Sequence, residues 1–146
     1  NVLYALAPGT SGDFTYSGAL TVSTVSADAL PRTKYTAITT GTSTLLAGDM
    51  SGAQNTFLYS SGGTTPSYTT RTATQLYTDT PNASVGSSYF LRVINANSGT
   101  LTMVMDASVT ATGTLTILTN TFRDFLVTFT SATAATMVQV GTGATS

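Results

Sequence analysis

The chain has 146 residues, enough for one domain, and 41% of them are apolar, which suffices for a core. Charged residues make up only 8% and the net charge is −1, which excludes charge-driven binding of nucleic acid or of an anionic membrane. Threonine supplies 33 residues, whereas histidine, cysteine, tryptophan and glutamate are absent, so the composition favours strands and leaves few side chains for chemistry.

Residues 1–34 are predicted to form an extended N-terminal arm. Breaks at Pro8–Gly12, Ser17-Gly18 and Leu30-Pro31 leave only short β-like pieces, which have the size to add to the edge of an existing sheet. The alternative is that these pieces are the first strands of the domain. The candidate assembly residues of the arm are Val2, Leu3, Tyr4, Leu6, Phe14, Tyr16, Leu20 and Val22.

Residues 35–146 are predicted to form the folded domain. A loop rich in glycine and serine is expected at Ser60–Pro66, and the one plausible helix is Arg71–Asp79, with Pro81 just past its end. Three short strands are expected before this helix: Tyr35–Thr40, Thr44–Leu46 and Thr56–Tyr59.

The last sixty residues carry the clearest pattern, which is a series of β-runs about 11 residues apart. Alternation is explicit in the run that holds Phe125, Val127 and Phe129 on one side. Because no helix is long enough for a parallel crossover, we expect mostly antiparallel sheets, and an all-β jelly-roll-like sandwich of about eight strands fits best. The five runs are Ser88–Asn95, Leu101–Met105, Thr112–Leu118, Arg123–Thr130 and Ala135–Gly141.

Catalytic chemistry has little support in this inventory. Without histidine or cysteine the chain cannot build the usual nucleophile systems or a zinc site, and its six aspartates fall mostly in predicted turns. We therefore predict no enzyme activity, no catalytic residue, no cofactor and no bound metal. Two weaker alternatives are an acidic pair and a calcium site built from Asp106, Asn97 and backbone carbonyls. No apolar run is long enough to insert in a membrane.

Two surface features invite a binding interpretation. The loops near Ser60–Pro66 and Tyr77–Ser84 combine tyrosine with small polar residues, which suits recognition of a receptor or glycan. Arg92 interrupts an apolar run and should either face solvent outside the sheet or pair with an acid across a subunit contact. Arg123 and Asp124 are expected to pair with each other. The candidate recognition residues are Tyr59, Ser61, Thr64, Tyr68 and Tyr77.

Residues 56–143 resemble a module of structural proteins from tailed phages and large DNA viruses, of the fibre, spike and capsid-decoration type. The resemblance lies in four stretches kept in order, with a "VG-x-S" strand, a "VT-x-x-GT" turn and a closing "VGTG". One departure is Arg71-Thr72-Ala73, where the family often has a proline. The resemblance implies a jelly-roll or related sandwich, commonly homotrimeric, on the outside of a virion. The matching stretches are Pro66–Leu76, Val85–Asn95, Leu101–Ile117 and Arg123–Gly143.

The expected function is that of a virion structural protein on a fibre, spike or capsid. Its partners would be further copies of itself, as a homotrimer, other virion proteins, and a host-surface receptor or glycan if the module also serves attachment. The scarcity of lysine and glutamate agrees with a surface partly buried against other chains. The alternatives are a subunit of a bacterial or archaeal extracellular filament joined by strand addition, and a carbohydrate-binding module, which the lack of tryptophan disfavours.

Overall fold

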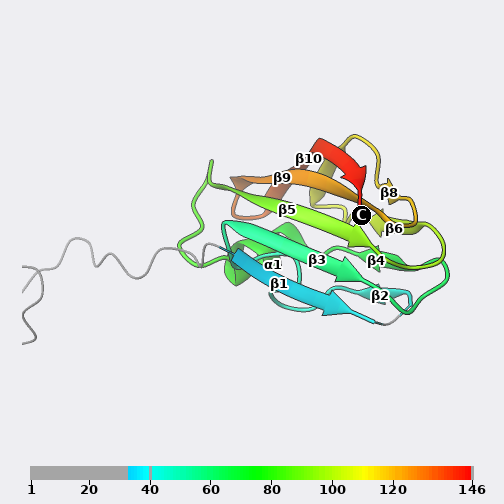
Figure 1. The fold of residues 1–146 in the computed structure, drawn as a ribbon. Coiled ribbons are helices and arrows are strands. Elements are labelled where there is room, and N and C mark those ends of the chain that lie inside the picture. Colours follow the sequence, from blue (N-terminus) through cyan, green and yellow to red (C-terminus); the bar gives the residue numbers. More distant parts are fainter. Residues whose placement is uncertain (1–32, 40, 146) are drawn as a thin grey trace, which may run out of the picture.

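A computed structural model describes residues 33–39 and 41–145 of the chain. These residues form a sandwich of two β-sheets with one short helix (Figure 1). The predicted all-β class with a single helix is therefore confirmed. The eight candidate assembly residues of the arm lie outside the described residues.

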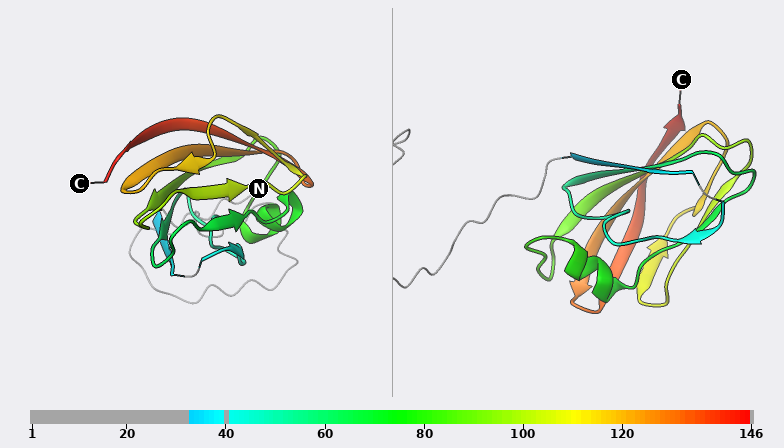
Figure 2. Two further views of the ribbon diagram at one scale, coloured as in Figure 1. Left: turned by 90° about the vertical axis from the view of Figure 1, so that its right-hand side faces the viewer. Right: turned by 90° about the horizontal axis from the view of Figure 1, so that it is seen from below.

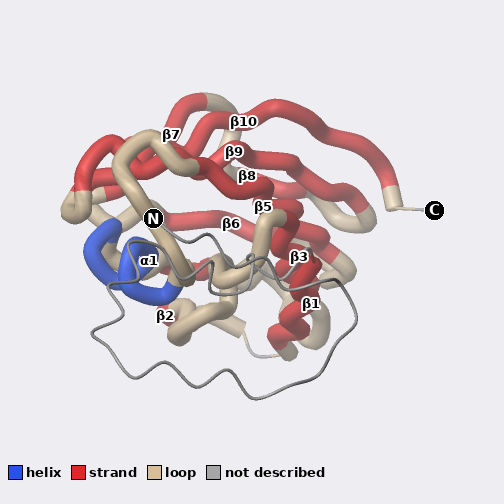
Figure 3. The backbone as a smooth tube through the Cα atoms, turned by 90° about the vertical axis from the view of Figure 1, so that its left-hand side faces the viewer, coloured by secondary structure: helices blue, strands red, loops and turns tan. Residues whose placement is uncertain are grey.

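Ten strands are described, six in a large sheet and four in a small one. The two sheets face each other, and in Figure 3 the large sheet curves from β1 round to β10 and β7. In order across the large sheet, the strands are β1 (Thr33–Ile38), β3 (Asn55–Ser60), β5 (Ser88–Asn95), β9 (Thr121–Ser131), β10 (Ala134–Ala144) and β7 (Val109–Thr112). Across the small sheet they are β2 (Ser43–Thr44), β4 (Ser67–Thr69), β6 (Leu101–Val104) and β8 (Thr116–Ile117).

The prediction of mostly antiparallel sheets is wrong. β1, β3 and β5 pair in parallel, as do β2, β4 and β6, and β7 pairs in parallel with β10. Only the pairings β5–β9, β9–β10 and β6–β8 are antiparallel. This order is not that of an antiparallel jelly roll.

The reason for the error is the way in which the chain returns between parallel strands. β1 to β6 alternate between the two sheets, so the chain winds as a coil of three turns. A parallel pair needs a crossover of a dozen or more residues, which is commonly a helix. In this coil each crossover passes through a strand of the opposite sheet, together with its flanking loops, and a long helix is unnecessary.

The core lies between the sheets and follows the alternation of the strands. Leu91 and Val93 of β5, and Phe125, Val127 and Phe129 of β9, are fully buried, as the sequence pattern predicts. Leu101 and Met103 of β6 close the core from the small sheet. Burying side chains of this size stabilises the fold by roughly 1.5–3 kcal/mol each.

Helix α1 (Ala73–Asp79) closes one end of the sandwich (Figure 2). Thr72 caps its N-terminus: the Thr72 hydroxyl accepts from Gln75 N at 3.2 Å, and Gln75 Oε1 accepts from Thr72 N at 3.1 Å. Leu76 is fully buried, and the ring of Tyr77 packs edge-on against Phe129. The helix was predicted to begin two residues too early, because Thr72 is the N-cap and Arg71 precedes it.

Strand boundaries differ from the sequence prediction in three places. The run Thr112–Leu118 is not one strand, because Gly113 adopts φ 107° and separates β7 from β8. The strand Ser67–Thr69 (β4) was not predicted from the sequence, because the residues around it are polar. β1 begins at Thr33, two residues before the expected start of the domain.

Candidate functional site

The outer face of the large sheet is the candidate site, because directly paired residues place apolar and aromatic side chains on it in three cross-strand rows. We call this surface the aromatic face. The first row is Thr33, Asn55, Phe90, Leu126, Val138 and Thr112; the second is Tyr35, Phe57, Arg92, Asp124 and Gly141; the third is Ala37, Tyr59, Ile94, Phe122 and Gly143.

Solvent reaches many of these side chains. Tyr35 is 60% exposed and Leu126 is 40% exposed, while Phe57, Phe90 and Ile94 are half-buried. The rings of Tyr35 and Tyr59 lie 5.9 Å apart between their centroids. A contiguous apolar surface of this kind is uncommon on a monomer and typically marks a contact with another molecule.

The outer face of the small sheet has a different chemistry. We call it the threonine face, and most of its side chains are hydroxyls of threonine and serine. Among its paired positions Val104, at 42% exposure, is the one aliphatic side chain, while Leu46 and Leu118 are exposed just beyond the ends of β2 and β8. The residues of this face are Thr44, Ser67, Thr69, Thr102, Val104 and Thr116.

A single ion pair lies in the middle row of the aromatic face. Arg92 of β5 donates from Nε and Nη2 to the two carboxylate oxygens of Asp124 on β9, at 2.7 and 2.8 Å. These hydrogen bonds raise the pKa of the Arg92 guanidinium above its ordinary value. They are the only charged residues in the three rows, so the face is electrically neutral as a whole.

Aromatic rings surround this ion pair. The Arg92 guanidinium lies 4.0 Å from the centroid of the Phe122 ring and 5.9 Å from those of Phe57 and Phe90. Asp124 is only 8% exposed. The pair is therefore held in one geometry, and it gives the apolar face a fixed polar point at its centre.

Two glycines of β10 make room for this arrangement. A Cβ on Gly143 would lie 2.7 Å from Phe122 Cζ, and one on Gly141 would lie 3.0 Å from Asp124 Oδ2. The side chains of β9 thus lie across the bare backbone of β10. The closing "VGTG" of the sequence is explained by this packing.

The predictions for the charged residues are partly corrected. Arg92 does face outward, but its acid belongs to its own chain. Asp124 does not pair with Arg123, whose Nε donates instead to the carbonyl of Thr116 at 2.6 Å. Lys34 reaches the carbonyls of Gly48 and Ser51.

The candidate recognition residues are not brought together. Tyr68 is a core residue with no exposed surface, and its hydroxyl lies 2.6 Å from Ser60 Oγ. Burial raises the pKa of Tyr68, and the hydrogen bond to Ser60 opposes this shift. Tyr77 is half-buried and packs on the core through Phe129. Tyr59 lies on the aromatic face, while Ser61 is half-buried and Thr64 is exposed in the loop.

A buried polar network that the sequence did not predict holds the loops at one end of the sandwich. Asn97 Nδ2 donates to Ser60 Oγ at 2.7 Å and to Asn95 Oδ1 at 2.8 Å. Asn97 Oδ1 accepts from Gly63 N at 2.7 Å. Since Asn97 is used in this way and Asp106 accepts from Ser108, the weaker alternative of a calcium site at Asp106 and Asn97 gains no support.

The acidic side chains of the described residues are engaged in local structure. Asp79 pairs with Arg71 at 2.9 Å, and Asp49 accepts from Leu46 N at 2.7 Å. Within residues 33–39 and 41–145, no three of histidine, cysteine, aspartate and glutamate gather to hold a metal. The same residues include no helix long and apolar enough to cross a membrane.

Comparison of the chain with protein families, curated proteins and solved structures gives no significant match. The fold and the aromatic face are therefore the observations on which a function can be argued.

The aromatic face could have been anticipated from the sequence. Tyr89-Phe90-Leu91 and Val93-Ile94 are apolar at consecutive positions, which places apolar side chains on both sides of a strand. A strand with one face in solvent would instead alternate with polar residues. Continuous apolar runs are thus the feature that indicates apolar side chains on both faces of a strand.

Proposed function

We propose that the chain is a non-enzymatic structural module of a virion surface, which assembles as a homotrimer through its aromatic face. The observation that carries the proposal is the contrast between this face and the threonine face. An apolar surface with a fixed ion pair at its centre suits a stable contact between copies, since interface centres are rich in aromatic residues and arginine.

The virion placement is supported by the resemblance of residues 56–143 to modules of phage and large DNA virus surface proteins. The low charge of the chain also agrees with a surface that is buried in an assembly. Neither argument identifies a receptor, and the proposed role is that of a building element.

Leu126 and Val104 provide a matched test. Both are aliphatic, both lie in strands, and they are 40% and 42% exposed on the two opposite outer faces. In Leu126→Glu a charge must be buried in the contact, so we expect the dissociation constant of the assembly to rise at least tenfold. Val104→Glu should leave it unchanged.

The measurement is the mass of the full chain in solution over a range of concentrations, by native mass spectrometry and sedimentation. Unsubstituted protein should have three times the mass of the chain. A monomer at all concentrations, or equal behaviour of the two variants, contradicts the proposal.

A filament subunit joined by strand addition is the second candidate, because β1 is an edge strand among the described residues. Electron micrographs of the assembled protein separate the two. Closed threefold particles favour the virion module, and open head-to-tail fibres favour the filament.

A further inference from the structure

The edge of the large sheet at β1 presents backbone groups that no described strand pairs. Ile38 O accepts from Ser61 N at 3.0 Å, so the backbone of Ile38 is directed to the β3 side. In a parallel ladder, alternate residues serve opposite neighbours. Tyr35 and Ala37 therefore direct their N–H and C=O groups to the free side of β1.

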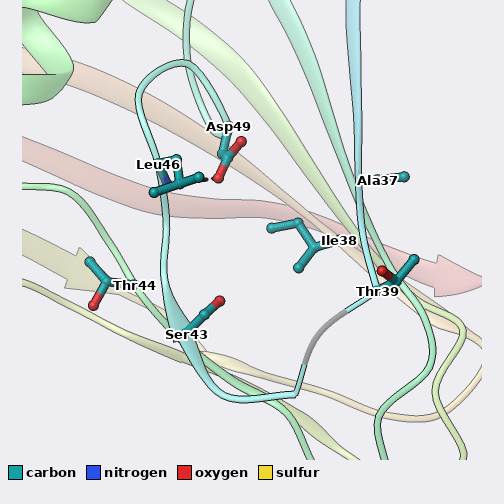
Figure 4. A pocket seen from close by; sticks show the side chains of 7 residues that line it. All are labelled: Ala37, Ile38, Thr39, Ser43, Thr44, Leu46 and Asp49. Atoms are coloured by element: carbon teal, nitrogen blue, oxygen red, sulfur yellow. Dashed lines mark hydrogen bonds between the residues drawn. The ribbon is translucent and has the colours of Figure 1, made fainter.

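Beside this edge the sandwich is open. A hollow of about 390 Å³ lies between the end of β1 and the segment that contains β2 (Figure 4). Ile38 is only half-buried and Leu46 is 70% exposed. The residues that line the hollow are Ala37, Ile38, Thr39, Ser43, Thr44, Leu46 and Asp49.

The neighbouring edge at β2 is less suited to accept a strand. β2 has two residues, and the N–H of Leu46 beyond it already donates to Asp49 Oδ2 at 2.7 Å. A strand that covers the hollow would consequently pair with β1, which is six residues long.

We propose that β1 accepts residues 20–25 of a second copy of this chain as an added strand. This segment, Leu-Thr-Val-Ser-Thr-Val, places Leu20 and Val22 on one side, where they would enter the hollow beside Ile38. No charged residue occurs between Asp13 and Asp28, so nothing in this stretch opposes burial. The inference rests on the self-association proposed above and names the contact that the N-terminal arm makes.

The donor is a second copy because the connection to β1 is poorly suited to folding back. Residues 26–32, Ser-Ala-Asp-Ala-Leu-Pro-Arg, contain neither glycine nor asparagine, and hairpin loops favour these residues and are usually two to five residues long. Pro31 favours an extended chain at Leu30. A parallel return within one chain would need a longer crossover. Tyr35 and Ala37 also place the β1 edge at the border of the aromatic face. A copy bound to the aromatic face would therefore have its N-terminal arm close to β1.

The absence of cysteine from the natural chain allows a direct test by disulfide trapping. Full-length chains with one donor substitution, Thr21→Cys, Ser23→Cys or Val25→Cys, are each mixed with full-length Tyr35→Cys chains of different mass and oxidised mildly. These donor positions alternate with Leu20 and Val22 and would share the outward side with Tyr35. Val104→Cys serves as the acceptor control, because Val104 is exposed on the opposite face.

We expect at least one donor to form a mixed disulfide with Tyr35→Cys at a yield several-fold above that with Val104→Cys. Adding Ala37→Pro to the acceptor should abolish the excess, since proline removes an N–H on the free side only, and Ala37→Ser should retain it. Circular dichroism checks that both acceptors remain folded.

Three results would overturn the proposal: equal yields with the two acceptors, an excess that persists with Ala37→Pro in a folded acceptor, and an intrachain link in a chain that carries both cysteines at low concentration. The test is independent of the Leu126 experiment. An assembly that dissociates on Leu126→Glu while no link forms refutes only the strand addition.

Discussion

The two outer faces of the sandwich show how one chain can use a single alternation rule for two purposes. On the small sheet, strands place core residues inward and threonine or serine outward, so the outer face is hydrated. On the large sheet, the same alternation places apolar residues on both sides of β3, β5 and β9. The two faces therefore differ in the residues at the outward-facing positions of their strands. These residues do not take part in the core.

The largest expected effect on stability concerns the ion pair of the aromatic face. In Asp124→Ala, Arg92 loses both hydrogen bonds while it remains half-buried among rings, so we expect the free energy of unfolding to fall by roughly 2–3 kcal/mol. Thr102→Ala on the threonine face should cost no more than about 0.5 kcal/mol. Urea unfolding followed by circular dichroism measures both. Equal losses would show that the two faces are energetically alike.

A smaller effect is expected where β10 supports the aromatic face. Gly143→Ala places a methyl group against the Phe122 ring, and we expect a loss of about 1–2 kcal/mol from overpacking. Gly41→Ala meets no atom within 4 Å and provides the control. The double variant Phe122→Ala/Gly143→Ala should lose less than the sum of its parts. Additive losses in thermal unfolding would contradict the packing described.

The smallest effect concerns acid at the end of the small sheet. Hydrogen bonds from the Ser108 hydroxyl and backbone lower the pKa of Asp106 below its ordinary value of 3.8. A lowered folded pKa stabilises the fold above 3.8, and this contribution is lost as the pH falls below 3.8 through the folded pKa. Asp106→Asn should therefore lose less stability than the natural chain between pH 4 and pH 2. Identical pH dependence in the two proteins would rule out this role.

The sequence predicted much of the strand pattern and little of the topology. β5 was predicted residue for residue, and the inward residues of β9 were identified, because local alternation determines which side each residue faces. Pairing partners depend on contacts between distant segments. Nothing in β1 alone indicates that it runs beside β3 in the same direction. The lack of a long crossover helix led to the wrong prediction of mostly antiparallel sheets.

For the candidate site, the sequence showed which residue types were present, but it did not show which of them lie next to each other in the fold. Arg92 was recognised as unusual within an apolar run, and its outward position was expected. Its partner could not be identified, because the choice between Asp124 and another acid depends on the register of β5 against β9. Tyr68 was misassigned because β4 is only three residues long, which is too short for its inward side to be recognised from the pattern.

The winding of the first six strands has a consequence for engineering. Between β2 and β3 the chain returns through residues 45–54, whereas between β4 and β5 it returns through residues 70–87 and includes α1. The longer return leaves the parallel pairing of β3 with β5 intact across all six residues of β3. Because Pro81 and Asn82 are exposed within this longer return, we expect a foreign peptide inserted there to leave both sheets paired.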